Sequence, residues 1–187
     1  MIVCEGEKTE PAYFKQLKHT FRNRLVHVDI EEGAGVPMSV VARAMELRDL
    51  ARAEDKAQRD ENLLHDQVWC VFDRDEHPRF EEACARAEQE DLRVALSNPC
   101  FELWPLLHLE AQTERLHRHD LQRKVTKLLK LANPKSLPLE KFHHGYQDAV
   151  DRARELRKTA ACTERPRGNP TTNVDELTEQ IREGGQP

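Results

Sequence analysis

The sequence predicts an α/β fold, in which a four-stranded, mostly parallel sheet is flanked by helices and followed by a C-terminal helical extension. Two observations predict it. Within residues 1–110, four apolar segments typical of buried strands alternate with helical segments, as in parallel sheets with right-handed crossovers. Within residues 111–187 the strand pattern stops, and helices and loops are expected. We therefore expect these two ranges to form two parts.

The first two strand-and-helix units open the chain. MIVC is a short β-favouring run that ends at EGE, and we interpret it as a buried strand. Thr9 is expected to cap the following helix, which has Pro11 in its first turn. A second strand is expected over residues 25–30. After the loop GAGVP, Ser39 is expected to cap a long charged helix that fades towards Asn62.

The third and fourth units have the same order. QVWCVF is a continuous apolar run, typical of a strand covered on both faces, and a helix from about Phe80 to Glu90 follows it. LRVALS predicts the fourth strand. In the next segment, NPCFELWPLLHLE, Ser97 or Asn98 is expected to cap a helix. Pro105 is expected to kink that helix because proline has no backbone N–H to donate.

Beyond Glu110 the sequence predicts helices that pack on the sheet or cover its active edge. RHDLQRKVTKLLKLA and YQDAVDRARELRKTAAC have amphipathic helical patterns, RPRGNPTTN is typical of a loop, and a short helix is expected over residues 174–183. Basic side chains are frequent here and form either a phosphate-binding stripe or ordinary solvated faces. They are Arg123, Lys124, Lys127, Lys130, Lys135, Arg152, Arg154, Arg157, Lys158, Arg165 and Arg167.

The composition indicates a folded protein without an overall basic field. The chain has 187 residues, a net charge of −5, and 34% charged against 38% hydrophobic residues. A polyanion would therefore have to meet a local basic patch or bound metal ions, and a simple basic DNA-binding module is disfavoured. Five scattered cysteines without a CxxC pair are typical of reduced thiols. With no leader-like or membrane-spanning apolar stretch in the sequence, a cytoplasmic location is expected.

Acidic side chains follow two of the predicted strands. Glu5 follows the first strand, and Asp73 and Asp75 follow the third. If these strands are neighbours, their carboxyl ends bring the acids together, where they would repel one another unless a cation lies among them. Mg²⁺ or Mn²⁺ prefers such oxygen ligands, and Glu10 and Glu76 are weaker candidates. Taken singly, each motif is as typical of a solvated turn or helix cap as of a metal site.

A metal at this edge would suit attack on a phosphodiester. Mg²⁺ usually keeps coordination sites for substrate phosphate, and it can polarise the phosphoryl oxygen and generate hydroxide. His77, next to a proline, is more typical of a surface or capping residue than of a catalytic base. His143, His144 and Tyr146 either assist proton transfer or belong to an ordinary loop.

Three strings in this order, EGEKTEPAYF, VFDRDEHP and SNPCFELWPLLH, resemble the RloB family, whose N-terminal part is similar to the Rossmann-like Toprim domain. The resemblance implies that Glu5 is the Toprim glutamate and that Asp73 and Asp75 form its DxD motif. Glu102 is either a further acid or a group that holds Asn98 and basic side chains, or simply a carboxylate near a helix N-terminus. Glu10 and Glu102 are supporting catalytic candidates.

The resemblance also implies a function. The implied function is that of a metal-dependent nuclease of prokaryotic antiviral defence, which acts on DNA or on RNA such as tRNA. An AAA- or ABC-type ATPase is the implied partner. The chain either forms a homo-oligomer or does not. One alternative is a non-catalytic sensor or docking subunit. Another is nucleotidyl transfer of the primase type, which is disfavoured because GAGVP is too short for a Gly-rich phosphate loop.

Overall fold

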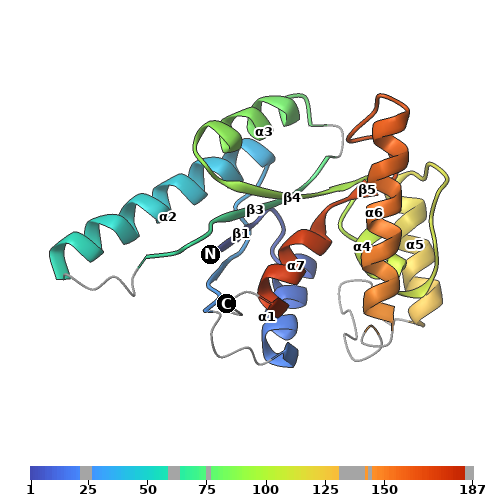
Figure 1. Cartoon of the computed structure of the whole chain (residues 1–187), viewed down its shortest axis with the longest axis horizontal. Coiled ribbons are helices and arrows are strands. Elements are labelled where there is room, and N and C mark those ends of the chain that lie inside the picture. Colours follow the sequence, from blue (N-terminus) through green and yellow to red (C-terminus); the bar gives the residue numbers. More distant parts are fainter. Residues whose placement is uncertain (22–26, 59–63, 75–76, 131–141, 143–144, 184–187) are drawn as a thin grey trace.

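The chain folds around one five-stranded sheet with the strand order β2-β1-β3-β4-β5 (Figure 1). The computed structural model describes residues 1–21, 27–58, 64–74, 77–130, 142 and 145–183. The strands are β1 (Ile2–Cys4), β2 (Ile30–Glu31), β3 (Trp69–Asp73), β4 (Arg93–Asn98) and β5 (Thr171–Thr172). The first four are parallel, and β5 pairs antiparallel with β4. The predicted α/β class with a mostly parallel sheet is confirmed, but the sheet has one strand more than expected.

Helices cover both faces of this sheet (Figure 1). They are α1 (Thr9–Phe21), α2 (Pro37–Gln58), α3 (Phe80–Gln89), α4 (Leu103–Leu109), α5 (Arg118–Leu129), α6 (Tyr146–Cys162) and α7 (Val174–Glu183). On one face, α2 and α3 share a core with the sheet. On the other face, α1 and the C-terminal helices form a larger core that contains residues from Ile2 to Ile181. The two predicted parts of the chain therefore share one hydrophobic core.

The central strand β3 explains why the sheet is covered on both sides. Successive side chains of a strand point to opposite faces. Accordingly, Trp69 and Val71 belong to the larger core, whereas Cys70 and Phe72 belong to the core under α2 and α3. All four side chains are buried, as the continuous apolar run QVWCVF predicts.

The structure corrects two predicted helix starts. Ser39 does not cap α2, because that helix begins at Pro37. Neither Ser97 nor Asn98 caps α4, because both residues end strand β4 and α4 begins only at Leu103. The Asn98 side chain instead donates a hydrogen bond to the Arg167 carbonyl at 2.7 Å.

Three further predictions are changed by the structure. Pro105 lies in the first turn of α4, where a backbone N–H has no partner within the helix, so the expected reason for a kink is removed. The segment RPRGNPTTN is not only a loop, because its two threonines form β5. The predicted strand over residues 25–30 lies partly outside the described residues, and the observed strand β2 covers Ile30–Glu31.

Candidate active site

The carboxyl ends of β1 and β3 bring Glu5 and Asp73 into direct contact. The two strands are neighbours, with Cys4 opposite Val71, and the Glu5 backbone N–H donates to the Val71 carbonyl at 2.9 Å. One step further along, the Asp73 backbone N–H donates to Glu5 Oε2 at 2.9 Å. The prediction that the first and third strands are neighbours is confirmed. Asp75 and Glu76, the other acids of this turn, lie outside the described residues.

His77 lies closer to this pair than the sequence suggested. Its Nε2 is 3.1 Å from Glu5 Oε1, so that the two oxygens of the Glu5 carboxylate contact the Asp73 backbone and the His77 ring. Both side chains are part-buried. His77 therefore lies at the end of β1, and a protonated His77 would form an ion pair with Glu5.

A cavity of about 710 Å³ opens beside Asp73, and three further acids, Glu7, Glu10 and Glu102, line it. Glu10, in the first turn of α1, is only 8% exposed. Glu102 immediately precedes α4. Gly6 allows the chain to pass close to Glu10, because a Cβ at this glycine would lie 2.5 Å from Glu10 Oε2. Both supporting candidates of the sequence thus lie with Asp73 at one cavity.

Burial and neighbouring acids raise the pKa of two carboxyl groups at this cavity, Glu10 and Asp73. Burial, then the nearby Glu102 and Glu5 carboxylates, raise the pKa of Glu10 from 4.5 to about 7. Burial, then repulsion from Glu10, Glu102 and Glu5, raise the pKa of Asp73 well above its usual range. Arg118 opposes both shifts without cancelling them. At Glu10 and Asp73, burial and the neighbouring carboxylates therefore outweigh the opposing charge of Arg118.

The opposite wall of the cavity is basic and comes mainly from α5. Arg118 begins this helix, and Arg123 and Lys127 follow on the same side, while Lys8 lies at the α1 side of the cavity. Gln122 on α5 reaches across to Glu102, with 3.4 Å between Nε2 and Oε1. Of the C-terminal helices, α5 therefore lines the cavity beside Asp73.

Several other candidates have structural contacts instead. Lys124 pairs with Glu110 at 2.5 Å, and Arg157 pairs with the buried Asp175. Tyr146 is a core residue whose hydroxyl hydrogen-bonds to Thr178 at 2.9 Å. His143, His144 and Lys135 lie outside the described residues.

Arg118 was not predicted, because a single arginine at the start of an amphipathic helix has no distinguishing pattern.

The donor set suits a hard divalent cation. Several carboxylates lie at this cavity. Mg²⁺ commonly binds one or two carboxylates and keeps water at its other coordination positions. Of the predicted ligands, Glu5 and Asp73 are joined by a hydrogen bond from the Asp73 backbone N–H to the Glu5 carboxylate. In the described part of the chain, no three His, Cys, Asp or Glu side chains are already grouped as a metal site. The third predicted ligand, Asp75, falls outside that part.

A scan against protein-family models matches residues 1–181 to the family described as RloB-like protein. The chain belongs to the RloB-like family. This membership confirms the family resemblance and extends it across the C-terminal helices. A comparison with curated proteins and one with solved structures each gave no match. Within the described ranges of this RloB-like chain, every helix is too short or too polar to cross a membrane.

Proposed function

We propose that this RloB-like protein is a metal-dependent nuclease that hydrolyses phosphodiester bonds of DNA or RNA with Mg²⁺ or Mn²⁺ in a Toprim-like site. The observation that carries the proposal is the contact between Glu5 and Asp73 at the ends of two adjacent parallel strands. Glu10 and Glu102 add acids to the same edge, and α5 adds a basic wall. Acids for a cation and bases for phosphate thus face one cavity.

In this proposal Glu5, Asp73 and Asp75 hold the cation. When bound, the cation would polarise the phosphoryl oxygen and supply a hydroxide nucleophile. Arg118 and its neighbours on α5 bind the non-reacting phosphate oxygens, for which guanidinium groups are well suited. Glu10 exchanges its proton near neutral pH, so it is matched to proton transfer at the cavity. His77 positions Glu5 through its Nε2 contact.

The biological setting that we propose follows from the family. A role in prokaryotic antiviral defence beside an ATPase partner, in the cytoplasm, is what the resemblance to RloB proteins implies. The alternative of a docking subunit predicts broad exposed apolar faces on the C-terminal helices. In the described helices α5, α6 and α7, Leu128 is the one exposed large hydrophobic residue, at 44% exposure. The enzyme is therefore the better-supported proposal.

The test compares wild-type protein with an Asp73→Asn variant. Purified proteins are incubated with plasmid, single-stranded DNA and total tRNA in Mg²⁺, Mn²⁺ or EDTA. We expect wild type to cleave at least one substrate only with metal, and the variant to lose cleavage by at least about a thousandfold because a metal ligand is neutralised. The circular dichroism melt should stay unchanged or rise, since repulsion among the acids is relieved.

The matched control is Asp151→Asn, an exposed aspartate on α6 outside the cavity that bonds only to Gln147 among described residues. It should cleave like wild type. Cleavage that persists in EDTA or in Asp73→Asn would overturn the proposal. Loss of activity together with a collapsed melt would assign Asp73 a structural role instead.

A further inference from the structure

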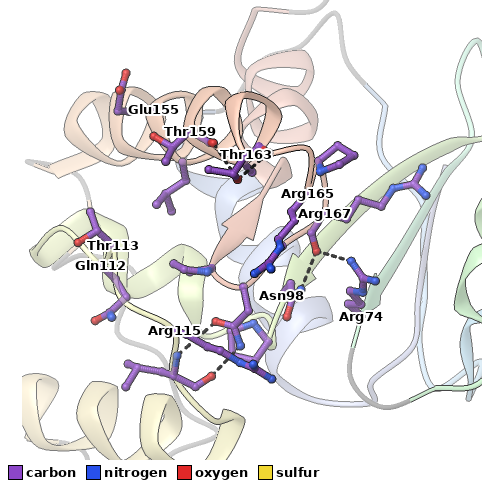
Figure 2. A pocket seen from close by; sticks show the side chains of 18 of the residues that line it. Arg74, Asn98, Gln112, Thr113, Arg115, Glu155, Thr159, Thr163, Arg165 and Arg167 are labelled. Atoms are coloured by element: carbon purple, nitrogen blue, oxygen red, sulfur yellow. Dashed lines mark hydrogen bonds between the residues drawn. The ribbon is translucent and has the colours of Figure 1, made fainter.

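A second and larger cavity, of about 1120 Å³, lies between the end of α6, the loop before β5 and the loop before α5. Arginine is its most frequent charged residue (Figure 2). We call it the arginine groove, and its arginines are Arg74, Arg115, Arg118, Arg152, Arg165 and Arg167. Three glutamates, Glu81, Glu155 and Glu164, also line it, so the cations are in excess.

Part of this positive charge is already used by the fold. Arg167 pairs with Glu81 at 2.6 Å, and Arg152 donates to the Leu107 carbonyl at 2.6 Å. Arg115 and Arg165 differ from Arg167 and Arg152 in this respect. Both side chains are exposed, and neither forms a hydrogen bond or ion pair with any described residue. Two guanidinium groups from separate loops are therefore available to an anionic ligand.

The groove reaches the candidate active site through Arg118. This residue lines both the arginine groove and the acidic cavity beside Asp73. The loop that carries Arg165 is also fastened to the active edge. The Arg167 carbonyl accepts hydrogen bonds from Arg74, directly after β3, at 2.5 Å and from Asn98, at the end of β4, at 2.7 Å (Figure 2).

The chemistry of the lining indicates which part of a ligand it recognises. Arginine presents a rigid fork of donors that matches phosphate oxygens. Pockets for single bases usually provide aromatic stacking surfaces, and the described lining of the groove contains no Phe, Tyr or Trp. The volume is near the upper end of small-ligand pockets, which accommodates a few nucleotides of one strand and not a duplex.

We propose that the arginine groove binds the sugar-phosphate backbone of a single nucleic-acid strand and leads it past Arg118 to the acids at the ends of β1 and β3. This inference rests on the proposed nuclease function and adds the form of its substrate. Recognition is through phosphates, so it is independent of base sequence and sensitive to salt.

Binding is measured in an Asp73→Asn background with Mg²⁺, so that cleavage does not interfere. The probes are fluorescein-labelled 20-nucleotide strands of mixed sequence, as DNA and as RNA, followed by anisotropy. We expect Arg115→Ala and Arg165→Ala each to weaken binding about tenfold, as for a lost charge-assisted hydrogen bond. Each should also lower the slope of log affinity against log salt by about 0.7, with the same loss for unrelated sequences.

The control is Arg52→Ala, which removes an equally exposed arginine from α2, away from both cavities. It should bind like the background protein, and all variants should melt at the same temperature because the substituted side chains are on the surface. Unchanged affinity and salt slope in the Arg115→Ala/Arg165→Ala double variant would overturn the proposal. Equal loss with a labelled polyglutamate in place of the strand would also overturn it, since a general anion site would then be shown.

The two proposals can fail separately. Arginine variants that lose binding, in a protein that cleaves no substrate with any metal, would support the groove and overturn the nuclease. Metal-dependent cleavage that is abolished by Asp73→Asn, with strand binding indifferent to Arg115 and Arg165, would support the nuclease and overturn the groove.

Discussion

Two buried carboxylates in this protein have opposite electrostatic surroundings. Asp175, at the start of α7, is 1% exposed and receives two hydrogen bonds from Arg157, at 2.5 and 2.8 Å. Glu10 is nearly as buried, but its strongest neighbours are other acids, which help to raise its pKa to about 7. The fold can therefore neutralise a buried acid with a paired arginine where stability requires it. At the ends of β1 and β3 it instead places several acids beside one another, an arrangement that suits a cation site.

The largest effect should come from breaking the neutralised pair. Arg157→Ala leaves Asp175 buried without its counter-charge and also removes a hydrogen bond to the Thr172 carbonyl of β5. We expect the free energy of unfolding to fall by about 3–5 kcal/mol. Urea denaturation measures it. The control is Arg154→Ala on the same helix, whose exposed pair with Glu179 should contribute less than about 1 kcal/mol. Equal losses of unfolding free energy in Arg157→Ala and Arg154→Ala would contradict the view that Arg157 neutralises a buried carboxylate.

The second effect concerns Glu10. Removing the charge of this residue should raise the free energy of unfolding, whereas removing the charge of Arg157 should lower it. Because its pKa is raised in the folded protein from 4.5 to about 7, the folded state binds this proton more tightly than the unfolded state. Stability should therefore be highest with Glu10 protonated, decline as pH rises from about 4.5 to about 7, and level off above. The decline attributable to Glu10 is at most on the order of 3 kcal/mol.

Glu10→Gln should remove this part of the pH dependence. In EDTA, the variant should be more stable than wild type at pH 8 and similar to it at pH 4.5, as measured by urea denaturation at both values. Glu88→Gln, an exposed residue of α3, should follow wild type at both. Identical pH profiles for wild type and Glu10→Gln would show that folding does not raise the pKa of Glu10.

The smallest effect should come from adding metal. An ion that binds only the folded state stabilises it by about 2.7 kcal/mol at a hundred times its Kd. We expect Mg²⁺ or Mn²⁺ to raise the Tm of wild type, with EDTA reversing the rise, and Asp73→Asn to lose the response. Arg157→Ala should keep the response on a lower baseline. A similar rise in wild type and Asp73→Asn would place the ion elsewhere in the molecule.

The parts predicted well from sequence are those that one local pattern determines. The apolar runs around β1, β3 and β4 predicted buried strands, and the general rule for parallel sheets then brought Glu5 to Asp73. β5 was missed because a two-residue strand has no periodicity to detect. Its position depends on distant contacts, among them the Asn173 side chain, which accepts from the Leu96 N–H at 2.7 Å and donates to the Val94 carbonyl at 2.8 Å.

The basic side of the candidate site was harder to predict for a similar reason. Arg118 reaches the acids because α5 packs against α4 and the larger core, to which Leu121, Val125 and Leu129 belong. His77 contacts Glu5, which is 72 positions away in the sequence. Both depend on tertiary packing, which a spacing of residues along the chain does not encode.

The carbonyl of Arg167 has one more consequence. By accepting from both Arg74 and Asn98, it ties the wall of the arginine groove to the tips of the two strands nearest the acids. The groove wall and the acidic edge are thereby joined by direct hydrogen bonds. A strand bound as we propose would then lie at a constant distance from the acids.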